Sequence, residues 1–253
     1  MIVSSREERG VRLAVDVQHE SRLNRALAIL IENHTMAKKT TSGKADRARP
    51  AAPKPRVLLV GASGTLGSAV HAELSQRHDV IAASRSSGKH RVDITDSASI
   101  SKLLKNLGTL DAIVCTAGTV HFGPLATMTD ALYAVGLRDK LMGQVNLALI
   151  GQEHLRDGGS ITLITGILAE QPIRAGSSAS MVNGALEAFV RAAAIELPRG
   201  LRINAVSPNV FAESMPGYGP FFRGFEAIPV ARAALAFSRS VEGAQTGQVY
   251  RVY

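Results

Sequence analysis

The sequence lacks the residues from which several kinds of site are built. Its 253 residues include one cysteine, Cys115, so this chain alone can form neither a disulfide nor a cysteine-built zinc site. The seven histidines show no spacing that is typical of metal ligands. We therefore expect no metal site, and the single thiol favours a reducing, cytoplasmic compartment.

Long apolar runs and stacking aromatic residues are also missing. No run reaches the roughly 18 apolar residues that a membrane-spanning helix needs, so we expect no membrane span. The net charge is +8; residues 1–55 hold 11 Lys and Arg against 6 Asp and Glu, and residues 56–253 hold 18 against 15. Because no aromatic residues accompany the basic ones, this charge favours a solvated basic tail over a nucleic-acid-binding surface.

The first 55 residues differ in composition from the rest of the chain. Residues 36–55 contain almost no bulky apolar residue and include three prolines, which predicts a disordered linker. Before the linker, residues 21–32 have leucine and isoleucine at near-helical spacing, which indicates a short helix. Met36, with lysines after it, resembles a translation start, so we expect the residues before it to add little to the folded domain. We predict a basic, mostly disordered extension over residues 1–55 and one domain over residues 56–253.

From residue 56 onward, short apolar runs alternate with helical patterns. This alternation is typical of a parallel sheet covered by helices on both faces. The predicted strands are residues 57–60, 79–83, 112–116, 160–165, 201–206 and 248–252. The predicted helices are residues 66–76, 97–107, 137–155, 179–197 and 230–241. We therefore predict a single α/β domain with a Rossmann-type, doubly wound parallel sheet.

A glycine-rich turn follows the first predicted strand. Gly61 permits a tight exit from the strand, Gly64 lets the backbone approach a pyrophosphate, and Gly67 allows close packing of helix on strand. The helix start then offers free N–H groups to the phosphates. An ordinary strand–helix turn is the alternative, but the position after the first strand favours a dinucleotide site. The predicted phosphate-binding residues are Gly61, Ser63, Gly64, Thr65, Leu66 and Gly67.

The end of the second predicted strand indicates which dinucleotide binds. A carboxylate there would accept hydrogen bonds from the ribose hydroxyls of NAD, but this chain has Ser84 and Arg85. Arg85 can pair with a 2′-phosphate, and Ser84 can donate a hydrogen bond to it. The sequence therefore favours NADP(H) over NAD(H), with a solvated surface arginine as the alternative.

Several further segments resemble the short-chain dehydrogenase/reductase family in their order along residues 56–253. They are Val92–Ile94, Cys115–Gly118, Ala185–Phe189, Arg202–Pro208 and Thr246–Gln248, in addition to the glycine turn. The resemblance implies that Asp93 and Ile94 contact the adenine of the cofactor. It also implies cofactor contacts for Ala117, Gly118, Asn183, Pro208 and Val210.

The catalytic residues of that family are not kept. The family uses a tyrosine, a lysine four residues later, a serine and often an asparagine, and no Tyr-x-x-x-Lys motif exists in this chain. The alignment places Ala179 at the tyrosine position and Asn183 at the lysine position. Gly166, next to Thr165, falls at the serine position, and Lys140 falls at the asparagine position. The sequence thus resembles a subgroup that keeps the glycine motif but lacks the usual active-site residues.

Four residues are candidates to take over the catalytic roles of the missing family residues. His121 follows the fourth strand and would titrate in a useful range, although an ordinary loop histidine is the alternative. Lys140 can place a cation near the nicotinamide, with a surface or interface lysine as the alternative. Thr165 lies beside the serine position, and Asn183 can bind a ribose hydroxyl without bringing charge. Residues 211–228, aromatic and glycine-rich, lie where the family has its substrate lid, with a packed surface loop as the alternative.

These observations favour an NADP(H)-dependent oxidoreductase of the short-chain type, acting on a carbonyl or alcohol substrate with a non-standard active site. The alternative is a catalytically silent NADP(H)-binding protein that acts as a sensor or scaffold. A relic that binds no nucleotide fits less well, because the glycine turn is intact. The resemblance also implies a homo-oligomer that assembles through the two long helices.

Overall fold

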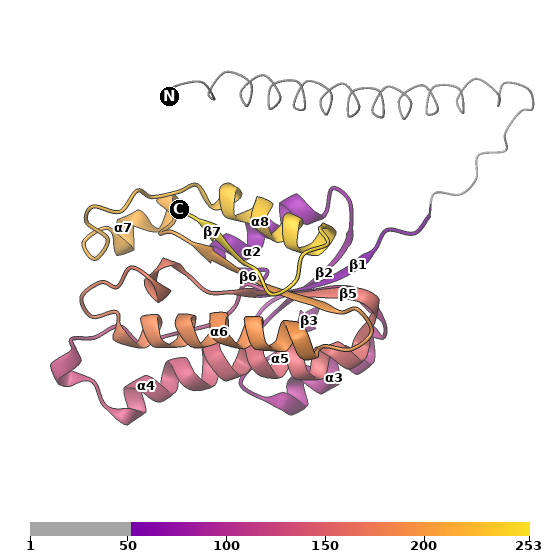
Figure 1. The fold of residues 1–253 in the computed structure, drawn as a ribbon, viewed down its shortest axis with the longest axis horizontal. Coiled ribbons are helices and arrows are strands. Elements are labelled where there is room, and N and C mark those ends of the chain that lie inside the picture. The colour runs from indigo at the N-terminus through magenta and orange to yellow at the C-terminus, as the bar shows by residue number, and fades with distance from the viewer. Residues whose placement is uncertain (1–51) are drawn as a thin grey trace, which may run out of the picture. The chain divides into compact units, whose positions relative to one another are not determined.

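Seven parallel strands form one sheet in the computed structural model, which describes residues 52–253 (Figure 1). The strands are β1 (Arg56–Val60), β2 (Asp79–Ser84), β3 (His90–Arg91), β4 (Leu110–Cys115), β5 (Leu155–Ile164), β6 (Arg202–Pro208) and β7 (Val249–Val252). Their order across the sheet is β3-β2-β1-β4-β5-β6-β7, and every neighbouring pair is parallel. The predicted doubly wound sheet is confirmed.

Helices cover both faces of the sheet (Figure 1). On one face lie α3 (Ser97–Leu107), α5 (Gly143–Gly151) and α6 (Ser177–Glu196). On the other face lie α2 (Thr65–Leu74) and α8 (Val230–Glu242), which pack against each other. Two short helices, α4 (Asp130–Gly136) and α7 (Met215–Tyr218), lie in the connections.

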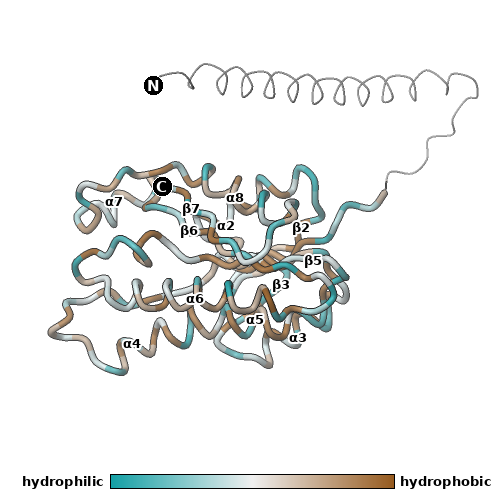
Figure 2. The backbone as a smooth tube through the Cα atoms, viewed as in Figure 1, coloured by the Kyte–Doolittle hydropathy of each residue, from teal (hydrophilic) through white to brown (hydrophobic). Residues whose placement is uncertain are grey.

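The core consists of two apolar layers, one on each face of the sheet. Strand β1 contributes to both because successive side chains of a strand point to opposite faces. Leu58 and Val60 join the layer under α3, α5 and α6, whereas Val57 and Leu59 join the layer under α2 and α8. Figure 2 shows the hydrophobic strands running between the helices. Such strands, buried on both faces, explain the continuous apolar runs in the sequence.

The boundaries predicted for residues 137–155 are wrong. The helical stretch begins earlier, with α4 at Asp130, where the hydroxyl of Thr129 accepts a hydrogen bond from the N–H of Leu132. It passes through a π-helical segment, Leu137–Met142, before α5. Residue 155, predicted to end the helix, instead begins β5, whose pairing with β4 shifts register near its start.

The carboxyl ends of β1, β4, β5 and β6 meet at one edge of the sheet. The strand order reverses between β1 and β4, and open α/β sheets bind their ligands in the crevice outside such a point. Thr116 ties the two ends together there, because its N–H donates to the carbonyl of Val60 at 2.8 Å. A ligand site is therefore expected among the loops that follow these strands.

Two further predictions concern the chain as a whole. Within residues 52–253, no helix combines the length and the apolar character needed to cross a membrane. The helix predicted at residues 21–32 and most of the predicted linker lie outside the described residues.

Candidate functional site

The glycine turn has the backbone geometry that the sequence predicted. Gly61 has a φ of 89°, and a Cβ there would lie 2.8 Å from the amide nitrogen of Ala117. A Cβ on Gly67 would lie 2.8 Å from the Cα of Ala62, so the helix packs directly on the turn. Both positions require glycine, one for the turn after β1 and one for the approach of α2.

The N-terminus of α2 is open to a ligand. No side chain caps it, and its first turn carries no acidic residue. Gly64 at the N-cap is exposed, a Cβ there would lie no closer than 3.6 Å to the carbonyl oxygen of Gly61, and Ser63 and Thr65 are exposed beside it. Unpaired N–H groups and the positive end of the helix dipole suit a phosphate. The turn therefore fits the predicted pyrophosphate site.

The guanidinium of Arg85, just after β2, lies between two carboxylates. Its Nη2 is 2.5 Å from Oδ2 of Asp139, and its Nε is 4.0 Å from Oδ1 of Asp93. The hydrogen bond that Arg85 donates to Asp139 raises the pKa of Arg85. The side chain is 56% exposed, so several of its five N–H donors remain accessible. A 2′-phosphate would therefore compete with Asp139 rather than meet an unpaired arginine.

The other adenosine-side residues are fixed by local contacts. The hydroxyl of Ser84 donates to the carbonyl of Ser87 at 2.6 Å, so it already has an acceptor. Asp93 accepts hydrogen bonds from the hydroxyl and N–H of Thr95, which lower the pKa of its carboxyl. Ile94 is buried against α5. Asp93 thus remains charged and rigidly placed at this end.

A cleft of about 320 Å³ lies at the carboxyl ends of the strands. It brings together predicted residues from six separate segments of the chain. Those that line it are Leu66, Gly118, Lys140, Thr165, Asn183, Pro208 and Val210. His121 is not among the described residues that line the cleft, and its catalytic role stays a prediction.

Lys140 is the charged side chain of this cleft. Its Nζ donates to the carbonyl of Thr165 at 3.3 Å, and its stem packs on Gly118, where a Cβ would lie 2.7 Å from the Cγ of Lys140. Burial lowers the pKa of the ammonium to about 8. The residue belongs to the π-helical segment, and such irregular turns are frequent at functional sites.

Gln144, which sequence reasoning missed, fixes that segment to the sheet. Its side chain is fully buried, and its amide accepts from the N–H of Ile164 at 2.8 Å and donates to the carbonyl of Ile164 at 2.9 Å. It also donates to the carbonyl of Lys140 at 3.2 Å. The side-chain amide of Gln144 thus pairs with the backbone at the end of β5 as a neighbouring strand would. The available signal was a polar residue inside an apolar helical pattern.

Asn183 and Thr165 face the same strand end from α6 and β5. The amide nitrogen of Asn183 donates to the carbonyl of Gly166 at 3.5 Å, whereas its oxygen is buried without a partner. The hydroxyl of Thr165 lies 3.3 Å from both Oε1 of Glu187 and the carbonyl of Val206, so its donor is used away from Lys140. The cleft therefore contains one orphaned acceptor, on Asn183.

Of the four tyrosines, all within the described residues, Tyr218 alone lines the cleft. Its ring makes edge contacts with Phe122, at 6.3 Å between centroids, and with Phe222, at 6.4 Å. Ala179, where the family has its tyrosine, also lines the cleft and is buried. Sequence reasoning placed residues 211–228 over the cleft as a group but did not single out Tyr218.

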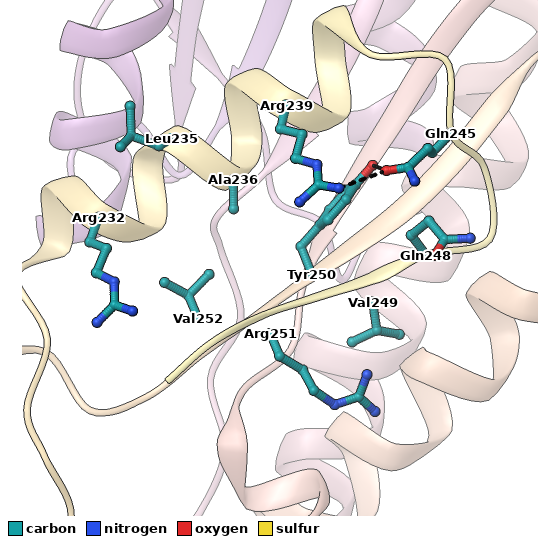
Figure 3. Close-up of a pocket in the computed structure, with 10 residues that line it drawn as sticks. All are labelled: Arg232, Leu235, Ala236, Arg239, Gln245, Gln248, Val249, Tyr250, Arg251 and Val252. Carbon is teal, nitrogen blue, oxygen red and sulfur yellow. Dashed lines mark hydrogen bonds between the residues drawn. The ribbon is translucent and has the colours of Figure 1, made fainter. Parts of the chain in front are cut away.

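A second hollow, which we call the edge groove, lies between α8 and β7 (Figure 3). It has a volume of about 490 Å³ and carries three arginines. They are Arg232, Arg239 and Arg251. Within residues 52–253, no group of three or more His, Cys, Asp or Glu side chains is arranged to hold a metal ion.

Known proteins resemble this chain over its described part. The family model for enoyl-(acyl carrier protein) reductase matches residues 61–250. The crystal structure of the protein lin1944 from Listeria innocua is 52% identical, with a TM-score of 0.78, and the match covers 79% of this chain and all of that one. A small-chain dehydrogenase in complex with NADPH is 25% identical, with a TM-score of 0.70, over 79% of this chain and 96% of that one.

Two fungal reductases are similar in sequence. Versicolorin reductase stcU from Emericella nidulans is 28% identical in an alignment of 185 residues that covers 62% of this chain and 69% of that protein. A probable tetrahydroxynaphthalene reductase from Zymoseptoria tritici is 33% identical in an alignment of 127 residues that covers 47% of each protein. The chain thus spans between 47% and 69% of the length of these two relatives.

Proposed function

We propose that this chain, which belongs to the short-chain dehydrogenase/reductase family, is an NADP(H)-dependent oxidoreductase with a non-standard active site. The observation that carries the proposal is an uncapped N-terminus of α2 followed, at the end of the next strand, by the guanidinium of Arg85. The first suits a pyrophosphate and the second suits a 2′-phosphate. The NADPH complex of a related dehydrogenase supports the same choice.

The cofactor would lie along the strand ends, from the adenosine side at Asp93 to the cleft at Asn183. The unpartnered oxygen of Asn183 is a ready acceptor for a ribose hydroxyl. When bound, the nicotinamide supplies the hydride of the reaction. The chain's own contribution is to orient the cofactor and the substrate and to exclude water.

We assign the cleft to a small, flat carbonyl compound or the corresponding alcohol. The rings of Phe122, Tyr218 and Phe222 favour an apolar, planar ligand. Lys140 offers a donor to its oxygen. The names of the two fungal relatives, a versicolorin reductase and a tetrahydroxynaphthalene reductase, support a hydroxylated aromatic compound or its keto form.

Binding titrations with NADPH and NADH test the cofactor. We expect NADPH to bind more tightly, because only its 2′-phosphate can engage Arg85. Equal or tighter binding of NADH would reject NADP(H) as the cofactor, and binding of neither would reject the dinucleotide site.

A second function is a cofactor-binding sensor or scaffold without turnover. The observation that favours it is Ala179, whose methyl group stands where the family has its proton-transferring tyrosine. NADPH binding without NADPH oxidation, across a panel of quinones and cyclic ketones, is the result expected of a sensor. Turnover of any compound in the panel would favour the enzyme.

We further propose that the chain forms a homo-oligomer through α5 and α6 and acts in the cytoplasm. Exposed apolar side chains recur at helical spacing along this face, with Met142 and Leu149 on one segment and Met181 and Ile195 on the other. Ile195 is 87% exposed. Replacing Ile195 with Lys should dissociate the assembly, measured as molar mass in solution, and an unchanged mass would exclude this face.

A further inference from the structure

The cleft contains a single cation whose neighbours leave it without an anionic partner. Among the cleft-lining residues that the structure describes, Lys140 and Tyr218 are the ones that can titrate. No carboxylate in residues 52–253 lies within 4.0 Å of the Nζ of Lys140. An ammonium has three donors, and the one recorded hydrogen bond, to the carbonyl of Thr165, uses one of them.

Each charged or titratable group around Lys140 is occupied elsewhere. Asp139, the preceding residue, accepts from the N–H of Thr119 at 2.9 Å and pairs with Arg85. Burial raises the pKa of the Cys115 thiol on β4 to about 12, so it is neutral. Glu187 on α6 binds the hydroxyl of Thr165 and is itself shifted toward the neutral form by burial. No neighbouring anion therefore competes with a ligand for the ammonium.

Lys140 is also held in place from both ends. Its carbonyl accepts from Gln144, which is bound to both polar backbone groups of Ile164 at the end of β5. Its stem fits against Gly118 after β4. A group fixed by packing and hydrogen bonds on rigid elements presents its donors in a constant position.

We infer that Lys140 is the catalytic proton donor of this site: its ammonium binds the carbonyl oxygen of the substrate and protonates that oxygen as hydride arrives at the carbonyl carbon. This inference rests on the proposed function. It gives Lys140 a task that no tyrosine on α6 is present to perform. It also explains why a cation stays in this cleft without an anionic partner.

The step balances with groups already named. The carbonyl carbon accepts a hydride, with its electron pair, from the reduced nicotinamide, and the π pair of the C=O bond moves to oxygen. A new O–H bond forms as the N–H bond of Lys140 breaks. The cofactor is oxidised, the carbonyl is reduced to an alcohol, and the neutral amine regains a proton from water. The pKa of about 8 keeps the donor charged at neutral pH while bringing it close to the range that favours proton transfer.

Two substitutions at Lys140 test the inference in the full chain, with NADPH and phenanthrenequinone as probes. Lys140→Met removes the donor, and Lys140→Arg keeps a charge that does not leave its nitrogen at neutral pH. We expect both variants to bind NADPH like the wild type, which also reports that they fold. We expect kcat for quinone reduction to fall about 10²- to 10⁴-fold in both. Lys105→Met, at an exposed position of α3, is the matched control and should keep full activity.

The pH profile and chemical labelling give readouts that a purely structural lysine would not move. Wild-type kcat should fall as pH rises through about 8, where the ammonium loses its proton, and this limb should vanish in Lys140→Arg. Competitive acylation, read residue by residue by mass spectrometry, should give Lys140 a lower pKa than exposed Lys102. Bound NADPH should protect Lys140 from the reagent and leave Lys102 reactive.

Several outcomes would overturn the inference while leaving cofactor binding intact. They are unchanged kcat in Lys140→Met, NADPH binding without protection of Lys140, and wild-type protein that binds NADPH but reduces no quinone. Loss of turnover in Tyr218→Phe, with activity kept in Lys140→Met, would assign proton transfer to the lid tyrosine instead. Failure to bind NADPH at all would instead reject the proposed function on which the inference rests.

Discussion

The cleft and the edge groove both contain basic side chains, but two of the three groove arginines have partners whereas the cleft lysine meets no anion. In the groove, Nε of Arg251 donates to Glu170 at 2.6 Å. Arg239 lies 4.9 Å from the centre of the Tyr250 ring and donates to Gln245 at 3.3 Å (Figure 3). In the cleft, Lys140 meets one carbonyl and no carboxylate.

This difference separates cations that stabilise the fold from one that is available to a ligand. An arginine paired at the surface already donates to an acceptor, and such pairs contribute little to the free energy of unfolding. A partly buried lysine without an anion lowers the stability of the protein, because its charge is desolvated without compensation. The hollow with more positive charge is therefore the weaker candidate for an active site.

The largest expected effect is on the support of the cleft. Gln144→Leu leaves the N–H and C=O of Ile164 buried without partners, and we expect the free energy of unfolding to fall by about 2 to 4 kcal/mol. Denaturant titration measures this loss. Gln76→Leu, at an exposed position after α2, is the matched control and should change stability by less than about 0.5 kcal/mol. A small loss in Gln144→Leu would mean that the end of β5 does not depend on this side chain.

Arg85→Ala should give the next largest effect, now on binding. Removal of a charge-assisted contact should weaken NADPH binding about 10- to 100-fold and leave NADH binding nearly unchanged. Titration of both cofactors against Arg85→Ala and against Arg232→Ala, in the edge groove, makes the comparison. Equal loss for the two cofactors would show that Arg85 does not recognise the 2′-phosphate.

Lys140→Met should stabilise the protein at neutral pH by about 1 to 2 kcal/mol, because it removes a desolvated charge. The pKa of Lys140 is lowered from 10.5 to about 8, so between these values the folded chain holds fewer protons than the unfolded chain. Wild-type stability should therefore rise relative to the variant as pH increases through this window. Thermal unfolding of both proteins across the window measures the difference, and a constant difference would mean that Lys140 is not desolvated.

The smallest effects are expected in the edge groove. Arg251→Ala removes an exposed ion pair with Glu170, and we expect a stability change below about 1 kcal/mol. NADPH affinity and quinone reduction should not change, since none of the residues that line the groove also lines the cleft. A clear loss of cofactor binding would remove the distinction between the two hollows.

The sequence was sufficient to predict six of the seven strands and the glycine turn, but the predicted strands did not include the two-residue β3. Apolar strands such as Val57–Val60 have a strong local signal because they are buried on both faces. Gly61 and Gly67 are required because a side chain at either position would clash with nearby backbone atoms. The boundary at residue 155 was missed because the start of β5 is set by pairing with β4. Pairing of this kind depends on residues distant in sequence and leaves no local pattern.

The candidate site was only partly predictable for the same reason. The positions of Lys140, Thr165 and Asn183 followed from the resemblance, and the structure brings all three to one strand end. The clamp formed by Gln144 was not predictable, because its partner is a backbone amide twenty residues away. Nor did the sequence indicate that Arg85, after β2, faces Asp139, which lies 54 residues away in the π-helical segment.

Asp139 and Lys140 are consecutive residues of the same π-helical segment, yet they serve opposite ends of the predicted dinucleotide site. One contacts the arginine beside the adenosine position, and the other lines the cleft. A phosphate that draws Arg85 away from Asp139 acts on the turn that carries Lys140. Any effect of that phosphate on the proton affinity of Lys140 is matched by an equal effect of Lys140 deprotonation on the affinity for the phosphate. A single peptide bond thus joins the residue that holds Arg85 to the residue that lines the cleft.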